Sequence, residues 1–175
     1  MEIEIATERL RLRRARPEDL DALHALASDW EVVKQTATWP WPPDRAFTAN
    51  RAQPMPAEIG LAGPVFDGDD LVGMMGVNAA KTGAVTDTGA GTVLGYMFAR
   101  QHWGRGFATE MGRALIAHAF AAYDWPSIEA CVFDENPASA RVLVKLGFDE
   151  TGRSDGACAA RGRALPTRSF RLARA

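Results

Sequence analysis

A glycine-rich turn between a strand-like and a helix-like segment is the feature of this sequence that most clearly indicates chemistry. In LGYMFARQHWGRGFATEMGRAL, residues 94–115, strand-like alternation gives way to helical spacing. A helix start leaves several backbone N–H groups unpaired at the positive end of the helix dipole, and glycines let a phosphate approach the main chain. A diphosphate would fit there. A tight turn whose glycines only satisfy backbone torsions explains the same pattern equally well.

Other kinds of ligand site are disfavoured by motif spacing. The turn contains neither the GxxxxGK[ST] phosphate loop nor the GxGxxG dinucleotide loop, which argues against ATP or an adenine dinucleotide. His24, His102 and His118 do not have the spacing of metal ligands, and Cys131 and Cys158 form no CxxC pair. We therefore expect no metal site.

A second motif, DENPASARVLVKLGF at residues 134–148, combines helix signals with a hydroxyl. Asn136 suits a helix N-cap, Pro137 suits the first turn, and Gly147 suits a helix stop, so the helix alone explains these three residues. Capping does not explain Ser139, a small hydroxyl in the first turn. Ser139 is therefore a candidate for chemistry, with a packing or surface serine as the alternative.

The elements that must position these motifs follow from hydrophobic periodicity. The expected strands cover residues 3–12, 59–66, 71–77, 92–99, 127–133, 148–153 and 166–173. The expected helices cover residues 17–29, 44–54, 102–123 and 137–146. Residues 36–44, TATWPWPPD, cannot be regular structure, residues 79–92 form a link, and residues 157–163 are interpreted as a flexible turn. The pattern indicates a mixed α/β layer of helices on a sheet.

Composition narrows the class of protein. The chain has 175 residues, nearly half of them apolar, which predicts a single domain over residues 1–175. Its net charge is −2 without a basic cluster, so nucleic acid is not expected as a partner. No apolar run is long enough for a signal core or a membrane span. Two cysteines far apart in the sequence do not indicate a disulfide framework and suit a reducing compartment, so a cytoplasmic location away from membranes is expected.

The two motifs together resemble the GNAT superfamily of acetyltransferases. That family carries a [Q/R]xxGx[G/A] turn after its fourth strand, and two registers compete here, QHWGRG at residues 101–106 and WGRGFA at residues 103–108. The second resembles the YWGKGYATEA form of the bacterial-type branch that acetylates the N-termini of ribosomal proteins. DENPASARVLVKLGF is similar to DENxxSxRVxEKLGF of the same branch, and the opening segment TERLRLRRARPEDLDALHALASD is similar too, so the resemblance covers most of the chain.

The resemblance implies a fold and a co-substrate. The fold would be mixed α/β (α+β), with a central, mostly antiparallel sheet of six to seven strands, flanked by about four helices and splayed between the fourth and fifth strands. The co-substrate would be acetyl-coenzyme A, with its pyrophosphate on the glycine turn. The cofactor-binding residues implied by the resemblance are Met97, Phe98, Trp103, Gly104, Arg105, Gly106, Phe107, Ala108, Thr109, Asn136 and Ser139.

The resemblance also implies a mechanism, in which an amine attacks the thioester directly in a ternary complex. A backbone N–H of Met97 or Phe98 would stabilise the oxyanion. Ser139 would be the catalytic hydrogen-bond donor to the departing thiolate, because the position of the tyrosine used by much of the superfamily is Leu143 here. The branch often has a glutamate where this chain has Thr92 and Val93, and an α-amine, with a pKa of about 7.7–8.0, depends least on such a base.

The acceptor is where the sequence is least informative. Trp39 and Trp41 lie in the loop that the family places across its acceptor groove, and they either cover an amine or fill a hydrophobic gap beneath the loop. The expected function is N-acetyl transfer to a protein N-terminus or a small-molecule amine. The alternative is a regulatory or sensor module that binds coenzyme A with little turnover. The sequence does not determine the oligomeric state and leaves a homodimer open.

Overall fold

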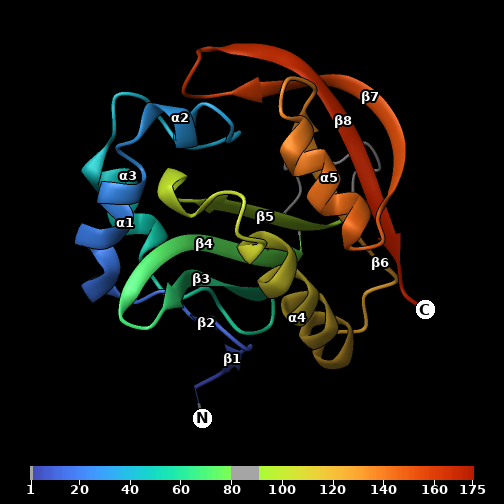
Figure 1. Cartoon of the computed structure of the whole chain (residues 1–175), viewed down its shortest axis with the longest axis horizontal. Coiled ribbons are helices and arrows are strands. Elements are labelled where there is room, and N and C mark those ends of the chain that lie inside the picture. The colour runs from blue at the N-terminus through green and yellow to red at the C-terminus, as the bar shows by residue number, and fades with distance from the viewer. Residues whose placement is uncertain (1, 80–90) are drawn as a thin grey trace.

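The computed structural model describes residues 2–79 and 91–175, and it shows a mixed α/β fold around one open sheet (Figure 1). Within the described residues the sheet has eight strands in the order β1-β2-β3-β4-β5-β6-β8-β7. The strands are β1 (Glu4–Ala6), β2 (Arg11–Arg13), β3 (Gly60–Asp67), β4 (Asp70–Ala79), β5 (Thr92–Phe98), β6 (Ser127–Phe133), β7 (Asp149–Cys158) and β8 (Arg163–Ala173). All neighbouring pairs are antiparallel except β5 and β6. The expected fold class is confirmed.

Helices cover both faces of this sheet. They are α1 (Leu20–Leu26), α2 (Trp30–Val33), α3 (Arg45–Arg51), α4 (Phe107–Ala122) and α5 (Pro137–Lys145), with short 3-10 turns η1 (Pro17–Asp19) and η2 (Arg100–His102). The main core joins α4 and α5 to the sheet, and a second cluster joins α1 and α2 to Met97 of β5. Figure 1 accordingly shows α1–α3 at one side of the molecule and α4 and α5 at the other.

The first strand predicted from the sequence is a hairpin, which is one reason why the sheet exceeds six to seven strands. The N–H of Thr7 donates to the carbonyl of Leu10 at 2.8 Å and reverses the chain, so Ile5 pairs with Leu12 across β1 and β2. Apolar alternation did not reveal this turn, because two short strands around a tight turn leave the same period-two pattern as one longer strand.

The last two strands are longer than predicted, and residues 157–163 are not merely a flexible turn. β7 and β8 pair from Asp149↔Arg171 to Cys158↔Arg163, leaving a tip at residues 159–162. β7 is a polar edge strand, so apolar alternation could not show its length. The tip reaches the segment after α2, where the N–H of Ala159 donates to the carbonyl of Ala37 at 2.9 Å. In Figure 1 the hairpin arches over the molecule toward α2.

Helix α2 was not expected, so five α-helices are described where about four were predicted. It has only four residues, too few for a hydrophobic period to be visible. The other predictions fit well: Asp44 caps α3 through its carboxylate, and residues 36–44 form no regular element. Residues 80–90 of the predicted link lie outside the described residues.

The parallel strands β5 and β6 separate soon after they meet. The residue pair that joins them within the described chain is Val93↔Glu129, near the start of both strands, whereas β5 pairs with β4 along its full length. This is the splay expected between the fourth and fifth predicted strands. It opens the sheet at the end of β5, directly before the glycine turn.

A carboxylate in the first turn of α4 attaches that turn to the β1–β2 hairpin. Glu110 accepts hydrogen bonds from Thr7 Oγ1 at 2.6 Å, from the Arg9 N–H at 3.0 Å and from Arg9 Nε at 2.7 Å. Burial raises the pKa of Glu110, but the hydrogen bonds from Thr7 and Arg9 outweigh it and hold this pKa below its ordinary value. The first turn of α4, which directly follows the glycine turn, is therefore held by hydrogen bonds to both Thr7 and Arg9.

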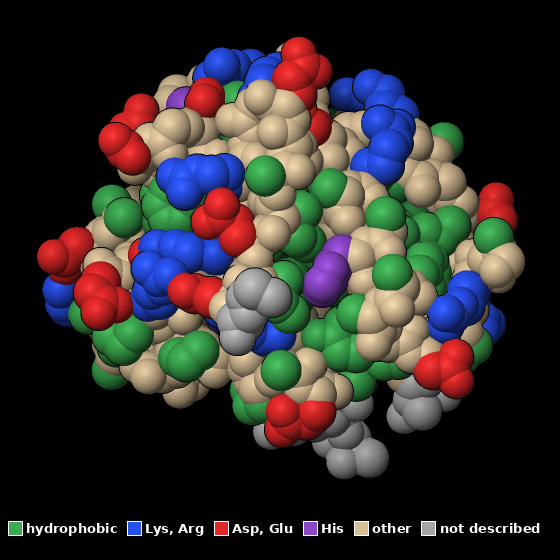
Figure 2. Space-filling view, turned by 90° about the horizontal axis from the view of Figure 1, so that it is seen from below, with side chains coloured by type: hydrophobic (Ala, Val, Ile, Leu, Met, Phe, Trp, Pro, Cys, Tyr) green, Lys and Arg blue, Asp and Glu red, His purple; other side chains and the backbone are tan. Residues whose placement is uncertain are grey.

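The surface carries charges of both signs. On the face shown in Figure 2, Lys and Arg side chains are interleaved with Asp and Glu rather than gathered into one basic area. No helix among the described residues is long and apolar enough to cross a membrane.

We predict that Glu110→Gln destabilises the fold by about 1 kcal/mol at pH 7, because charge-assisted hydrogen bonds are lost at a partly exposed site. The loss should be present in full above about pH 4.3, the ordinary pKa of glutamate in an unfolded chain. It should disappear as the pH falls through the lower folded-state pKa. Urea unfolding at several pH values measures it, with the exposed Glu8→Gln as control. A pH-independent loss would contradict the assignment to the carboxylate charge.

Candidate functional site

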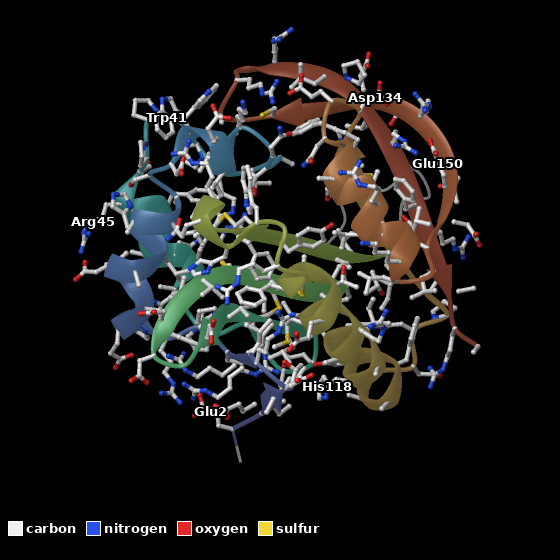
Figure 3. The ribbon with its side chains drawn as sticks, in the orientation of Figure 1. Glu2, Trp41, Arg45, His118, Asp134 and Glu150 are labelled. Carbon is white, nitrogen blue, oxygen red and sulfur yellow. The ribbon has the colours of Figure 1, made fainter. Side chains whose placement is uncertain are left out.

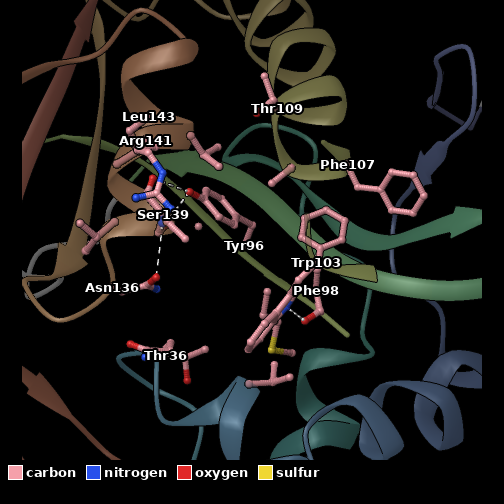
Figure 4. Close-up of a pocket in the computed structure, with 18 of the residues that line it drawn as sticks. Thr36, Tyr96, Phe98, Trp103, Phe107, Thr109, Asn136, Ser139, Arg141 and Leu143 are labelled. Atoms are coloured by element: carbon pink, nitrogen blue, oxygen red, sulfur yellow. Dashed lines mark hydrogen bonds between the residues drawn. The ribbon is translucent and has the colours of Figure 1, made fainter. Parts of the chain in front are cut away.

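A cavity of about 470 Å³ lies where β5 and β6 separate (Figure 4). It is lined from α2, the end of β5, the glycine turn, β6 and the start of α5. Ten of the eleven predicted cofactor-binding residues line it: Met97, Phe98, Trp103, Gly104, Gly106, Phe107, Ala108, Thr109, Asn136 and Ser139. The fold thus brings the two sequence motifs to one cavity, although about thirty residues separate them along the chain.

The glycine turn has the backbone geometry that the sequence suggested. Gly104 and Gly106 have φ of +74° and +78°, in the left-handed region that favours glycine. A side chain added at Gly104 would meet nothing within 4 Å, so the main chain is open on that side. The first hydrogen bond of α4 runs from Glu110 N–H to Gly106 O at 2.9 Å. The amides of residues 107–109 therefore have no partner within the helix and are available to an anion.

Trp103 attaches the glycine turn to the end of β5. Its indole Nε1 donates to the carbonyl of Phe98 at 2.8 Å, and its own amide donates to the carbonyl of Arg100 at 3.1 Å. The indole lines the cavity and is 49% exposed. Because the Trp103 amide is occupied, the amides free for an anion begin after it.

Arg105 is the predicted cofactor residue that does not line the cavity. Its guanidinium lies 4.5 Å from the ring centroid of Phe107 and 3.6 Å from the carboxylate of Asp67, and it contacts His102 at 3.0 Å. The Arg105 side chain thus packs against His102, Phe107 and Asp67 and is not part of the cavity lining. Sequence spacing alone could not show whether Arg105 contributes its backbone or its side chain to the cofactor site.

The end of β5 distinguishes between the two predicted oxyanion donors. The N–H of Ala99 donates to Val72 of β4 at 2.8 Å, and in an antiparallel ladder successive residues direct their N–H groups to opposite sides. Phe98 thus directs its N–H away from β4, toward the gap between β5 and β6, and its carbonyl is on the same side, bonded to Trp103. Met97 directs its N–H to β4. Phe98 is therefore the better placed donor.

Ser139 lies at the start of α5 and contacts a second hydroxyl group. Its N–H donates to Asn136 Oδ1 at 3.3 Å, which confirms the predicted N-cap. Its Oγ lies 2.7 Å from the phenol oxygen of Tyr96 on β5 (Figure 4). Leu143, at the position of the usual tyrosine, is fully buried. A phenol is therefore present at Ser139, but β5 supplies it instead of α5.

Tyr96 is a residue that sequence reasoning did not single out as functional. Burial raises the pKa of Tyr96 to about 12, although the hydrogen bond with Ser139 partly opposes that shift. The phenol therefore keeps its proton throughout the neutral pH range. The sequence could have indicated Tyr96 through its place in LGYMF, because it lies two residues before Phe98 and so on the same face of the strand.

Charged residues line the two ends of the cavity differently. Arg141 and Lys145 are exposed and lie four residues apart, and so on one face of α5. Glu31 of α2 and Lys34, the residue directly after α2, form an ion pair of 2.6 Å. Among the described residues that line the cavity, Glu31 alone carries a carboxylate. Sequence reasoning missed Glu31 because α2 was not predicted.

The acids near Asn136 do not line the cavity. Asp134 forms an ion pair with Arg153 at 3.1 Å, and Glu135 forms one with Arg161. The hydrogen bond from Arg161 lowers the pKa of Glu135 below its ordinary value, against a smaller opposing effect of burial. These two carboxylates hold the β7–β8 hairpin against the loop before α5 and do not face the cavity.

The wall formed by the segment after α2 contains a polar group that a ligand could satisfy. Arg161 Nε donates to the carbonyl of Lys34 at 3.1 Å, and Cys158 Sγ contacts the carbonyl of Thr36 at 3.3 Å, so the hairpin tip holds this segment. Gln35 Oε1 is buried at the same wall and has no hydrogen-bond partner among the described residues. A buried oxygen of this kind favours a ligand that brings an N–H group.

Neither tryptophan of the predicted acceptor lid lines the cavity. Trp39 is 7% exposed and packs edge-on against Phe47 with ring centroids 5.3 Å apart, as the gap-filling alternative describes. Trp41 is 37% exposed, packs against Trp30, and lies at the outer side of the molecule in Figure 3.

In the part of the chain that is described, no group of three His, Cys, Asp or Glu side chains could hold a metal ion.

Comparisons with known proteins agree with this geometry. An N-acetyltransferase of Bacillus licheniformis named p20, itself uncharacterized, is 32% identical over 173 residues, covering 95% of this chain and 93% of its own. A GNAT-family acetyltransferase from Bacillus anthracis superimposes with a TM-score of 0.77 at 22% identity, over 98% of both chains. RimL, a ribosomal L7/L12 α-N-protein acetyltransferase solved with coenzyme A, superimposes with a TM-score of 0.79 at 18% identity, over 98% of both chains.

The family assignment rests on a match that covers most of the chain. Residues 9–149, which include both motifs and the whole cavity wall from α2 to α5, match the acetyltransferase (GNAT) domain. The chain therefore belongs to the GNAT acetyltransferases, enzymes that transfer an acetyl group from acetyl-coenzyme A.

Proposed function

We propose that this chain transfers an acetyl group from acetyl-coenzyme A directly to an amine, with both substrates bound together. The observation that carries the proposal is the single cavity that joins the glycine turn of α4 to Ser139 at the start of α5. An anion site at one end and a hydroxyl at the other suit a co-substrate with a diphosphate and a thioester. The residues present therefore fit acetyl-coenzyme A.

The glycine turn would hold the diphosphate. The unpaired amides of residues 107–109 and the positive end of the α4 dipole favour an anion there. Arg141 and Lys145 add positive charge along the α5 side of the same cavity. Asn136 would act through the backbone, because its side chain is already used to cap α5.

The acetyl end would react near Phe98 and Ser139. The Phe98 N–H, which faces the gap between β5 and β6, would stabilise the oxyanion that forms when the amine attacks the carbonyl. Ser139 would be the catalytic hydrogen-bond donor to the sulfur that leaves. In this assignment Met97 contributes its side chain to packing with Val33 and Trp39 rather than an amide to the reaction.

The acceptor would meet the α2 side of the cavity. Glu31 would attract the positively charged amine, and Gln35 Oε1 would accept a hydrogen bond from it. The bases in the described lining are Glu31, which is paired with Lys34, and His102, whose Nδ1 contacts Arg105. Because both are already engaged, an α-amine with its pKa of about 7.7–8.0 suits the site better than a lysine side chain near 10.4. We therefore propose a peptide or protein N-terminus as the first acceptor class and a small-molecule amine as the second.

Several broader assignments belong to the same proposal. We propose that residues 1–175 act as one domain in the cytoplasm, and the one sheet that contains all the described strands supports the single domain. A homodimer stays a prediction that gel filtration with light scattering would test. The sensor alternative would require that Ser139 has no role in turnover.

The direct test follows release of free coenzyme A thiol from acetyl-coenzyme A while acceptors are added in turn. The panel contains peptides with different N-terminal residues, the same peptides with blocked N-termini, and small amines. We predict release that depends on a free α-amine. Calorimetry supplies the affinity for acetyl-coenzyme A in parallel. Tight binding with no release from any acceptor would favour the sensor, and no binding would exclude both functions.

We predict that Ser139→Ala lowers kcat about 100-fold, the usual scale for losing a group that stabilises the transition state. The dissociation constant of acetyl-coenzyme A should change less than about threefold, because a hydrogen bond to neutral thioester sulfur contributes little. Steady-state kinetics and calorimetry measure the two effects. Ser28→Ala is the control, because the Ser28 hydroxyl donates to the His24 carbonyl and does not line the cavity. An unchanged kcat would remove Ser139 from the mechanism.

We predict that Arg141→Ala with Lys145→Ala raises the KM for acetyl-coenzyme A about tenfold at low salt, with kcat nearly unchanged. The effect should shrink as salt screens the interaction between these cations and the phosphates. Arg113→Ala, an exposed change on α4, is the matched control. A KM that is unaffected, or affected equally at all salt concentrations, would contradict a phosphate-facing role.

A further inference from the structure

The hydroxyl groups of Tyr96 and Ser139 form the closest polar contact between β5 and α5 that lines the cavity. The phenol oxygen lies 2.7 Å from Ser139 Oγ and 3.4 Å from the carbonyl oxygen of Ser139. Hydrogen bonds between hydroxyl groups prefer about 2.5–3.0 Å. The contact between the two hydroxyl oxygens is therefore the shorter and stronger one, and either oxygen can be its donor.

This contact determines what the serine hydroxyl can do. A serine hydroxyl has one proton to donate and rotates freely unless a neighbour restrains it. When Ser139 Oγ accepts from the phenol, its own proton is left for another acceptor, and a hydroxyl that accepts one hydrogen bond donates a stronger one. The bond from the Ser139 N–H to Asn136 Oδ1 restrains the residue from the backbone side.

Packing alone does not explain a tyrosine at this position. Tyr96 borders the main core, and Phe98 lies on the same face of β5 with ring centroids 6.5 Å apart and no hydroxyl. Burying a phenol oxygen is unfavourable unless it finds a partner. The partner that it finds is the one serine hydroxyl of α5, which faces the cavity.

We propose that Tyr96 is a positioning residue, which holds the Ser139 hydroxyl as a hydrogen-bond donor to the sulfur of acetyl-coenzyme A. The inference rests on the proposed function. The high pKa of Tyr96 agrees with it, since a phenol that stays protonated remains a donor. Tyr96 thereby replaces, from β5, a phenol that α5 lacks at Leu143.

The reaction balances without a proton from either side chain. The amine nitrogen bonds to the carbonyl carbon and loses one proton as the amide forms. The carbon–sulfur bond breaks with its electron pair on sulfur, and the sulfur takes up one proton from solvent. Tyr96 and Ser139 keep their protons throughout, and they lower the barrier by stabilising the thiolate as its charge develops.

The test compares Tyr96→Phe, Ser139→Ala and the double variant, with Tyr123→Phe as the matched control. The chain has two tyrosines, and the Tyr123 hydroxyl donates to the Ala57 carbonyl at 2.8 Å; neither Tyr123 nor Ala57 lines the cavity. Two properties are measured: kcat, and the pKa of the thiol of bound coenzyme A from the ultraviolet absorbance of the thiolate.

We expect Tyr96→Phe to lower kcat about tenfold, the scale of one hydrogen bond, with the KM for acetyl-coenzyme A nearly unchanged. In Ser139→Ala the same tyrosine change should have almost no further effect, because Tyr96 acts through Ser139. Both single variants should raise the pKa of the bound thiol, and Tyr123→Phe should not. Independent, multiplicative losses, or an unchanged thiol pKa in Tyr96→Phe, would overturn the proposal.

A second variant keeps the test decisive if Tyr96→Phe does not fold. In the Tyr123→Phe background Tyr96 is the one tyrosine left, so biosynthetic replacement by 3-fluorotyrosine makes the phenol a stronger donor without removing it. The pKa of the bound thiol should then fall further, and a rise or no change would refute the positioning role. Because the thiol pKa needs no acceptor, a shift in it without turnover would retain the inference while rejecting the transferase.

Discussion

The separation of β5 from β6 is the constraint on which the rest of the site depends. Two parallel strands that meet at Val93↔Glu129 and then diverge leave part of a central strand without a neighbour, which is unfavourable inside a protein unless another group satisfies the exposed backbone. Here the indole of Trp103 bonds the Phe98 carbonyl. The Phe98 N–H remains directed into the gap, where a substrate oxygen can meet it. The opening that weakens the sheet thus supplies the donor that the chemistry needs.

Two helix starts converge on this opening and give it its polarity. α4 begins directly after the glycine turn, and α5 begins directly after its N-cap, Asn136, so both positive helix ends lie at the cavity wall. One suits a diphosphate and the other suits a thiolate, the two negative charges that acetyl-coenzyme A presents or develops. The bonds from Thr7 and Arg9 to Glu110 hold the first helix start, and the cap and the Tyr96 contact hold the second.

The sequence predicted the parts of the site that depend on local structure. Gly104, Gly106 and the capped start of α5 were recognisable because turn torsions and caps are properties of a few consecutive residues. Tyr96, Glu31 and the docking of the β7–β8 tip were not, because each depends on contacts between segments distant in the chain. Local periodicity likewise could not show the β1–β2 turn or the length of an edge strand whose two faces are both polar.

A crystal structure of this chain with coenzyme A would decide whether the gap between β5 and β6 is the reaction site. We expect the diphosphate on the amides of residues 107–109, the pantetheine arm between β5 and β6, and the sulfur within hydrogen-bond distance of Ser139 Oγ. The Ser139 hydroxyl should still be in contact with the phenol of Tyr96. A coenzyme A bound elsewhere, or with its sulfur directed away from α5, would contradict this assignment.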